Sequence, residues 1–384
     1  MGIPFDKIPT PCYLLNEEAL EINLQILHMV EQEANVKIIC ALKGFAFWHE
    51  FPMVKHYLSG ATASSLNEAQ LIFEEMNTEA HTYCPVYTKE EFPLLLQMSS
   101  HLTFNSLSQY QNLLPIYHST GKKVSLGLRV NPEYSEVSTD LYNPAGEDSR
   151  LGIRRRFLDN TLPPEIEGLH CHALCENDSY TFERTLQALE KKFGTLISQA
   201  RWLNLGGGHL ITKEGYNIEH LVGLLQNLHR RYPNLEEIIL EPGEAVGWQT
   251  GVLVAEIQDI IHGNDFDIAM LDTSFACHMP DCLEMPYKPN IINARDARKG
   301  DKYVYRMGGN SCLAGDFMGM GDYAFDQPLK VGEKIIFDDM IHYTMVKTTF
   351  FNGVKHPHIA VWTKDQQLEM LRQFTHEDYK NKLS

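Results

Sequence analysis

The sequence predicts an α/β protein in which a closed (β/α)8 barrel, of the TIM type, is followed by an all-β domain. Between residues 36 and 243, eight short apolar runs alternate with stretches that have helical spacing. After about residue 247, the apolar runs are separated by Gly, Pro, Asn and Asp instead of helices. Several of the eight runs end in polar residues or glycines, as the strands of barrel enzymes do. An open doubly wound sheet is the structural alternative, since it uses the same alternation of strands and helices.

The elements follow in order along the chain. Residues 10–15 are strand-like, and Asn16 then caps the start of a helix. We expect this strand to join the all-β domain, so residues 1–25 form an N-terminal segment, 26–247 the barrel and 248–384 the C-terminal β-domain. The barrel strands are expected at 36–43, 57–65, 79–86, 101–106, 123–131, 165–174, 200–208 and 235–243. The later strands are expected at 250–262, 267–271, 303–307, 334–337, 344–351 and 358–362. Within the barrel, Ser65 and Glu68 have the spacing of a capping box at a helix start.

Composition excludes several functional classes. The chain has 384 residues, 43% of them apolar, with 33 basic and 50 acidic residues and a formal charge of -17. This charge disfavours nucleic acid and anionic membranes and favours a cationic ligand, although solubility alone explains it equally well. The eight cysteines are scattered, and neither a signal core nor a membrane-spanning apolar run is present. We therefore expect a cytoplasmic protein with no nucleic-acid or membrane partner.

Lys43 ends the first expected barrel strand and is followed by Gly44. An amine at the C-terminal end of a barrel strand can hold an aldehyde cofactor as a Schiff base. A surface lysine that caps a strand is the simpler explanation if the residue is considered alone. The triplet 206–208 ends the seventh strand and residues 241–243 end the eighth, so backbone amides at both strand ends could surround a phosphate. An ordinary tight turn is the alternative.

Two further strand ends carry ionisable side chains. Glu241 ends the eighth strand and could keep a pyridine nitrogen protonated, which makes pyridoxal phosphate an electron sink; a buried ion pair is the alternative. His170 and His172 share one face of the sixth strand, whereas Cys171 and Cys175 share the other. A four-ligand zinc site is therefore not expected. One imidazole could stack on a flat cofactor while the other belongs to the core.

The β-domain contributes a loop, residues 308–316, that displays a thiol and a carboxylate. Cys312 could protonate a carbanion, and Asp316 could bind a substrate ammonium. Tyr343 could donate its hydroxyl to a phosphate. A turn with an incidental cysteine and a core tyrosine are the corresponding structural alternatives.

Together these residues resemble the fold-type III pyridoxal-phosphate decarboxylases, which have an alanine-racemase-like barrel. The matching segments extend over nearly the whole chain and are residues 10–11, 41–43, 128–132, 149–153, 168–172, 206–208, 241–243, 312–316, Tyr343 and 351–353. Within this family, residues 310–316 followed by 321–323 most closely resemble the members that act on carboxylated polyamines.

The resemblance implies a carboxy-lyase with pyridoxal 5′-phosphate as cofactor. Lys43 would be the Schiff-base residue, His172 would stack on the pyridine ring, and Glu241 would pair with its nitrogen. The residues expected to hold the phosphate are Gly208, Gly243 and Tyr343.

The resemblance also implies roles for the β-domain residues. Cys312 would reprotonate the carbanion left by decarboxylation, with Lys43 as a possible partner. Asp281, Asp316 and Glu284 would bind a cationic carboxylated polyamine. Because the Cys312 loop reaches into the partner's site in this family, a homodimer with shared active sites is expected.

Three departures from the family pattern bear on specificity. Glu244 stands where most relatives carry arginine, and Leu174-Cys175 replaces Gly-Ser, so the phosphate is held by fewer donors. Leu313 replaces an acidic residue of the ornithine and diaminopimelate enzymes. The alternatives are a decarboxylase of diaminopimelate, ornithine or arginine, an amino-acid racemase, and a catalytically silent regulatory homologue.

Overall fold

A computed structural model describes residues 2–264 and 266–384, so Met1, at the start of the predicted N-terminal segment, lies outside the described residues. The chain divides into two compact units. One contains Ile22–Val246, and the other contains the residues up to Glu21 together with Gly247–Ser384. Within the described residues, no helix combines the length and the apolar character needed to cross a membrane.

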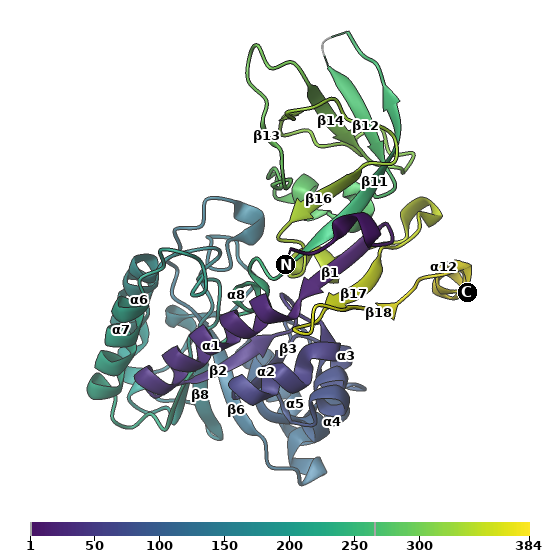
Figure 1. Ribbon diagram of the computed structural model, residues 1–384. Helices are drawn as coiled ribbons and strands as arrows, with labels where there is room; N and C mark the ends of the chain where they lie inside the picture. Colours follow the sequence, from purple (N-terminus) through teal and green to yellow (C-terminus); the bar gives the residue numbers. More distant parts are fainter. Residues whose placement is uncertain (1, 265) are drawn as a thin grey trace. The chain divides into compact units, whose positions relative to one another are not determined.

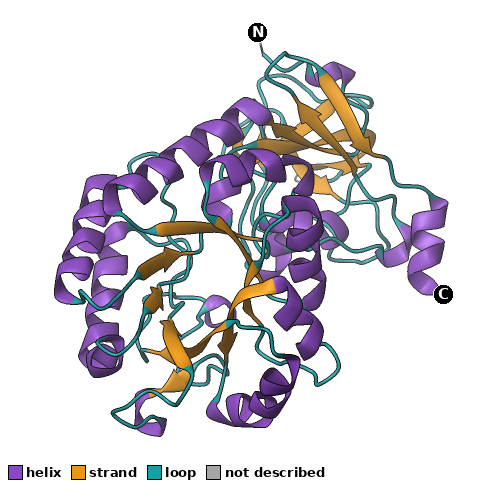
Figure 2. Ribbon diagram, turned by 90° about the horizontal axis from the view of Figure 1, so that it is seen from below, coloured by secondary structure: helices purple, strands orange, loops and turns teal. Residues whose placement is uncertain are grey.

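The first unit is a closed parallel barrel, which confirms the predicted fold class. Its strand order is β5-β4-β3-β2-β10-β9-β8-β6, and pairing between β5 and β6 closes the ring. Figure 2 shows the ring of strands with helices around it. The strands are β2 (Lys37–Ala41), β3 (Gly60–Ala63), β4 (Ala80–Tyr83), β5 (Ser99–Phe104), β6 (Ser125–Asn131), β8 (Ile166–His170), β9 (Trp202–Asn204) and β10 (Glu237–Leu240), and the short β7 (Ile153–Arg154) pairs with β6.

The helices of this unit bury one face each. In α6, Leu186, Leu189 and Phe193 recur at helical spacing and are buried, as are Leu221 and Leu225 in α7. The helices are α1 (Glu17–Ala34), α2 (Phe51–Tyr57), α3 (Leu66–Leu71), α4 (Phe92–Met98), α5 (Leu107–Thr120), α6 (Ser179–Ile197), α7 (Ile218–Arg231) and α8 (Glu244–Gly247). The predicted Asn16 cap is confirmed, because its side chain accepts the amides of Glu18 and Ala19.

Trp202 fills the barrel interior near the start of β9. A Cβ atom on Gly168 would lie 1.9 Å from the indole ring, and one on Gly127 would lie 2.2 Å from it. The indole Nε1 donates a hydrogen bond to Ser125 Oγ at 2.8 Å. Gly168 on the adjacent β8 and Gly127 on β6, the next strand along, therefore make room for the tryptophan, and the interior is packed rather than open.

The second unit contains a mixed sheet with the order β13-β15-β14-β12-β11-β1-β17-β18, and β16 also pairs with β11. As predicted, the N-terminal strand belongs to this sheet: β1 pairs antiparallel with β11 and parallel with β17 (Figure 1). The strands are β1 (Cys12–Asn16), β11 (Gly251–Ile261), β12 (Asp267–Leu271), β13 (Arg295–Asp296), β14 (Val304–Gly308), β15 (Tyr323–Ala324), β16 (Lys334–Asp338), β17 (His358–Trp362) and β18 (Leu368–Arg372). The short helices are α9 (Phe275–His278), α10 (Asp281–Glu284), α11 (Tyr343–Val346) and α12 (His376–Leu383).

One predicted strand of the β-domain is wrong. Residues 344–351 are rich in β-branched and aromatic residues, yet they fold as the last turn of α11, a loop and the start of a 3-10 turn at Phe351–Gly353. The amide of Lys347 donates to the carbonyl of Tyr343, and that of Thr349 donates to Cys277. These bonds use donors that a sheet ladder would need, so tertiary context overrides strand propensity here.

The Trp202 packing predicts a matched pair of glycine substitutions with opposite effects. Gly168→Ala should lower the free energy of unfolding by about 1–3 kcal/mol, because the added methyl collides with the indole ring. Gly223→Ala, inside α7 with no atom within 4 Å of the added Cβ, should raise it by up to about 1 kcal/mol. Urea unfolding followed by circular dichroism compares the two. Equal stabilities would contradict the packing described for Trp202.

Candidate active site

The ends of β2 and β10 approach each other through their backbones. The amide of Ala41 donates to the carbonyl of Pro242 at 2.9 Å. A Cβ atom on Gly44 would lie 2.9 Å from the Cα of Gly243, and one on Gly243 would lie 2.9 Å from the oxygen of Ala41. Only glycine fits at both positions. This close contact brings Lys43 beside the strand end that carries Glu241.

Lys43 faces the imidazole of His172. Its Nζ atom lies 3.3 Å from His172 Nε2, while His172 Nδ1 accepts the amide of Gly207 at 3.1 Å. A Cβ on Gly206 would lie 2.6 Å from this same Nδ1 atom, so the ring can occupy its position only next to a glycine. Because Nδ1 is an acceptor, the neutral ring carries its proton on Nε2, which is directed at Lys43.

Burial lowers the pKa of His172 well below its usual value, and the charges of Lys43 and Arg129 lower it further. Burial also lowers the pKa of Lys43, as does the charge of Arg129, while Glu241 acts in the opposite direction. The Lys43 side chain keeps exposed surface, so the lowering of its pKa is smaller than in a fully dehydrated lysine. Both shifts stabilise the neutral forms of the two side chains relative to their charged forms. A neutral amine is the nucleophilic form.

Glu241 lies just past the end of β10, with only 12% of its side chain exposed. Its Oε1 atom accepts the side-chain amide of Asn204 at 2.6 Å, and Asn204 Oδ1 in turn accepts the amide of Gly206 at 2.8 Å. Burial raises the pKa of Glu241, whereas the hydrogen bond from Asn204 and the charge of Lys43 lower it. Asn204 therefore fixes the carboxylate relative to the glycine turn after β9.

His170 lies behind Glu241, with its Nε2 atom 3.5 Å from Glu241 Oε2. It is 2% exposed, and among the described residues neither of its ring nitrogens has a hydrogen-bond partner. Burial holds the pKa of His170 well below its usual value, and its ring meets that of Tyr83 edge-on at 5.2 Å. Of the two histidines, His172 thus contacts Lys43, and His170 belongs to the core.

Sequence reasoning missed two charged residues near Lys43. Arg129 on β6 is 4% exposed, donates to the carbonyl of His172 at 3.1 Å and lies over the Tyr83 ring. Glu68 was expected only as a capping residue; its amide does donate to Ser65 Oγ at 3.2 Å, but its carboxylate accepts the amide of Ser64 at 2.6 Å. Burial raises the pKa of Glu68, and the charge of Lys43 lowers it. The position of Arg129 within residues 128–132 was the available signal.

The glycine turn after β9 brings backbone close to backbone. Gly206 and Gly208 have φ angles of +68° and +87°. A Cβ on Gly207 would lie 2.1 Å from the carbonyl oxygen of Glu241, and one on Gly208 would lie 2.1 Å from that of Leu174. A turn without side chains, near the turn of Gly243, fits a phosphate group held by backbone amides.

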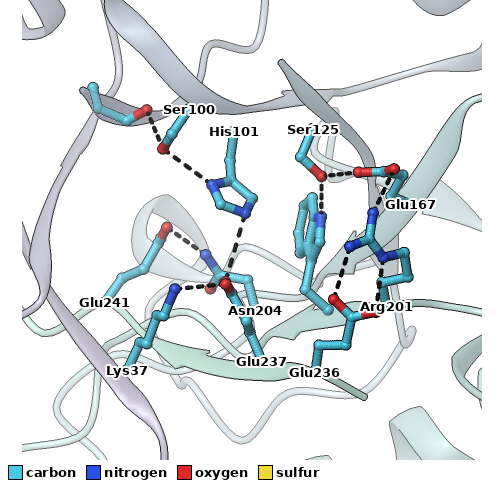
Figure 3. Close-up of polar contacts among 12 residues, drawn as sticks. Lys37, Ser100, His101, Ser125, Glu167, Arg201, Asn204, Glu236, Glu237 and Glu241 are labelled. Carbon is cyan, nitrogen blue, oxygen red and sulfur yellow. Dashed lines mark hydrogen bonds and ion pairs between the residues drawn. The ribbon is translucent and has the colours of Figure 1, made fainter. Parts of the chain in front are cut away.

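The opposite ends of the strands carry ion pairs instead of a site (Figure 3). Lys37 Nζ lies 2.5 Å from Glu237, whose other carboxylate oxygen lies 3.6 Å from His101 Nε2. Arg201 bridges two further carboxylates, Glu167 and Glu236, each at 2.8 Å. Because the N-terminal ends of barrel strands serve stability and the C-terminal ends serve chemistry, the barrel site lies at the Lys43 end.

In the β-domain, the structure brings Asp281 and Glu284 together on α10, where both contact the ammonium of Lys347. The distance from Lys347 Nζ to Glu284 Oε2 is 2.9 Å. Tyr343 begins α11, one turn before Lys347. Asp281 and Glu284, expected at the substrate, therefore lie on α10, and Tyr343, expected at the phosphate, lies on α11. Ion pairs of Lys347 connect the two helices.

Asp316 and Cys312 lie in the loop that follows β14. The two carboxylate oxygens of Asp316 accept the amides of Ala276 and Ser311, each at 3.0 Å. This buried carboxylate therefore fixes the loop, a role that its sequence position did not indicate. Cys312 is exposed, and its amide donates to Asn352 Oδ1 at 2.8 Å.

The barrel residues fit pyridoxal phosphate. The structure brings Lys43, His172, Glu241, Gly208 and Gly243 together at one end of the barrel, as expected from their strand-end positions. They provide an amine for the aldehyde, a flat neutral ring, a carboxylate for the ring nitrogen and a glycine turn for the phosphate.

Comparisons with known proteins agree with this fit. The family described as "Pyridoxal-dependent decarboxylase, C-terminal sheet domain" matches residues 13–341. The chain is 49% identical to the carboxyaminopropylagmatine decarboxylase of Synechocystis sp., over 98% of this chain and 96% of that protein. It is 45% identical to the carboxynorspermidine/carboxyspermidine decarboxylase of Campylobacter jejuni, over 98% of each. The crystal structure of carboxynorspermidine decarboxylase from Campylobacter jejuni, complexed with norspermidine, aligns with a TM-score of 0.90 at 44% identity, over 98% of this chain and 100% of that one.

His209, the residue after the glycine turn, should make the free energy of unfolding decrease in acid. His209 is 1% exposed, stacks on Phe182 and has a pKa of about 4, because burial disfavours its charged form. The unfolded chain therefore protonates first as the pH falls. The stability that the neutral ring contributes is complete above pH about 6.5 and is lost as the pH falls toward 4, by up to about 3 kcal/mol.

His209→Gln should therefore reduce the change in unfolding free energy between pH 7 and pH 4.5, measured by urea unfolding at both values. His118→Gln is the matched control, since His118 lies at the surface beside Glu165. An unaltered pH dependence in His209→Gln would refute the assignment.

Proposed function

Because the chain belongs to the pyridoxal-dependent decarboxylase family, we propose that it decarboxylates carboxynorspermidine and carboxyspermidine to norspermidine and spermidine, in polyamine biosynthesis. The observation that carries this proposal is the Asp281–Glu284 pair, which already contacts an alkylammonium group, that of Lys347. A polyamine tail ends in the same chemical group. The same substrate class is supported by the sequence identity to the Campylobacter jejuni relative, which extends over 98% of each chain. It is also supported by the similarity to the crystal structure of the Campylobacter jejuni enzyme with norspermidine.

In this proposal the barrel residues hold the cofactor. Lys43 would bind its aldehyde, His172 would contact its ring, and Glu241 would keep the ring nitrogen protonated. Gly208 and Gly243, with the hydroxyl of Tyr343, hold the phosphate. Bound pyridoxal phosphate supplies the electron sink for the bonding electrons left when CO2 departs.

The remaining residues act on the substrate. The thiol of Cys312 would deliver a proton to the substrate carbon that loses CO2, and the amine of Lys43 would be its partner in this proton transfer. Asp281 and Glu284 bind the cationic end of the substrate. Asp316 acts by holding the Cys312 loop, and a direct contact of its carboxylate with a substrate ammonium is the further role expected from the sequence. Leu313 in place of an acidic residue disfavours ornithine and diaminopimelate.

Carboxyaminopropylagmatine is a second candidate substrate, favoured by the 49% identity to the Synechocystis protein of that name. It differs from the carboxylated polyamines in the group at its cationic end, a guanidinium instead of an ammonium. An acid pair accepts either group, and a guanidinium can engage two carboxylate oxygens at once. Both candidates require the same barrel residues.

We further propose a homodimer with shared active sites in the cytoplasm. Leu313 and Phe351, close to Cys312 and Asn352, are 45% and 49% exposed, which is consistent with a subunit contact around the Cys312 loop. The eight cysteines are all free thiols, as in a reducing compartment.

Substrate choice is tested by measuring CO2 release from six compounds at equal concentration. These are carboxynorspermidine, carboxyspermidine, carboxyaminopropylagmatine, meso-diaminopimelate, ornithine and arginine. We expect kcat/KM for the best carboxylated polyamine to exceed that for each amino acid by at least about 100-fold, since several charged contacts discriminate between them. A preference for any of the three amino acids would overturn the proposal, and a preference for carboxyaminopropylagmatine would select the second candidate.

The catalytic assignments are tested with two defective variants. Lys43→Ala should lose both the visible absorbance band of the bound cofactor and CO2 release. Lys37→Ala, at the start of β2 and so at the opposite end of this strand from Lys43, should keep both. Cys312→Ala should bind the cofactor but turn over slowly.

Mixing Lys43→Ala with Cys312→Ala then tests the shared site. If each site combines Lys43 of one subunit with Cys312 of the other, random reassociation restores about a quarter of wild-type activity, because half the dimers are hybrids with one intact site of two. Activity that stays at the level of the separate variants would contradict a shared site.

A further inference from the structure

Lys347 contacts both Asp281 and Glu284, the acid pair that is proposed to bind the substrate. Asp281 and Glu284 lie three residues apart on α10, so their side chains share a helix face. Lys347 follows the last residue of α11 and contacts both carboxylates, with 2.9 Å between its Nζ and Glu284 Oε2. The group that it presents is a primary alkylammonium, the same group that ends a polyamine tail.

The three side chains differ in their exposure. Asp281 is 11% exposed at its side chain, Lys347 32% and Glu284 53%. A dehydrated carboxylate such as Asp281 costs free energy when it has no partner, whereas the half-exposed Glu284 is well hydrated. Lys347 thus compensates mainly the charge of Asp281. Counted by themselves, these three side chains carry one ammonium and two carboxylates, a combination that favours a further cation.

We propose that Lys347 is a specificity-determining residue that competes with the cationic end of the substrate for Asp281. When the substrate ammonium arrives, Lys347 gives up Asp281 and remains paired with Glu284. No bond is formed or broken in this exchange: one ion pair replaces another. The inference rests on the proposed function, since it assumes that the acid pair receives the cationic end of a carboxylated polyamine.

The proposal explains why two carboxylates are needed for one ammonium. If Asp281 were the sole carboxylate of the pair, Lys347 and the substrate ammonium would compete for it directly. Because Glu284 also contacts Lys347, the lysine keeps a carboxylate contact when it leaves Asp281. The arrangement therefore sets the affinity for the cationic end and discriminates against substrates whose end is neutral or absent.

A structural ion pair between α10 and α11 would make different predictions. Removing the lysine would then disturb the helices and weaken binding of every substrate equally. A competing lysine predicts the opposite sign, tighter binding, and only for substrates with a cationic end. The sign and the charge dependence of the effect separate the two roles.

The test uses the holoenzyme with Lys347→Met, which keeps the apolar length of the side chain and removes its charge. KM for carboxynorspermidine and the calorimetric Kd for norspermidine should both fall about tenfold, with kcat changed less than about twofold. Carboxynorspermidine acetylated on its terminal amine should show an unchanged KM. Lys347→Arg should behave like the wild type, and so should Lys364→Met, which removes a lysine paired with Glu21 elsewhere in the same unit.

Glu284→Gln provides a second line of evidence and needs no loss of the lysine. With its alternative partner gone, Lys347 should hold Asp281 more firmly, so KM should rise in the wild-type background and rise much less in Lys347→Met. Such non-additivity is the signature of coupling between the two residues.

Several outcomes would overturn the proposal. These are a KM that is unchanged or raised in Lys347→Met, an equal change for the acetylated substrate, or independent effects of the two substitutions. The proposed function fails separately, if the wild type releases no CO2 from any carboxylated polyamine. The norspermidine Kd still reports on Lys347 in that case.

Discussion

The backbone contact between the ends of β2 and β10 is the constraint on which the barrel site depends. Gly44 and Gly243 approach so closely that neither tolerates a Cβ atom. This contact aligns the turn that carries Lys43 with the strand end that carries Glu241. From there, Asn204 connects Glu241 to the glycine turn, and that turn connects to His172. The relative positions of Lys43, Glu241 and His172 therefore depend on the contact between Gly44 and Gly243.

Burial makes the protonation states of these residues depend on one another. The pKa of Lys43 is lowered by burial and by Arg129, and the charge of Lys43 in turn lowers the pKa of His172, Glu241 and Glu68. A proton gained or lost at Lys43 therefore changes the pKa of each of the other three residues. In the proposed function, a covalent link between Lys43 and an aldehyde would change the charge at this position and would therefore shift the pKa values of the other three residues.

Much of the fold and part of the site could be predicted from the sequence. Alternating strands and helices identify a barrel, and residues at strand ends then converge because parallel strands end on the same side. Lys43, Glu241 and the pair of His170 and His172 were found in this way, and the resemblance to the family selected His172 from the pair. Side chains that act through distant partners give no such signal. Asn204 looks like any residue of an apolar strand, and Glu68 looks like a helix cap.

Lys347 was missed for a different reason. It falls within a run of β-branched and aromatic residues, which predicts a strand, and a strand would not have placed it one turn after Tyr343. At the end of α11 the amide of Lys347 bonds to Tyr343, and in the following loop the amide of Thr349 bonds to Cys277, so neither bonds to a neighbouring strand. Such tertiary bonds are invisible to local propensity.

The packing of Trp202 against Gly127 and Gly168 has a consequence for how this barrel can diversify. A larger residue at either glycine strikes the indole, and a smaller residue at position 202 leaves a void, so each single substitution is unfavourable. Two or three positions must change together before another arrangement becomes accessible. This epistasis makes the barrel interior appear invariant to single-site mutagenesis, whereas a combinatorial library of the three positions would sample the alternatives.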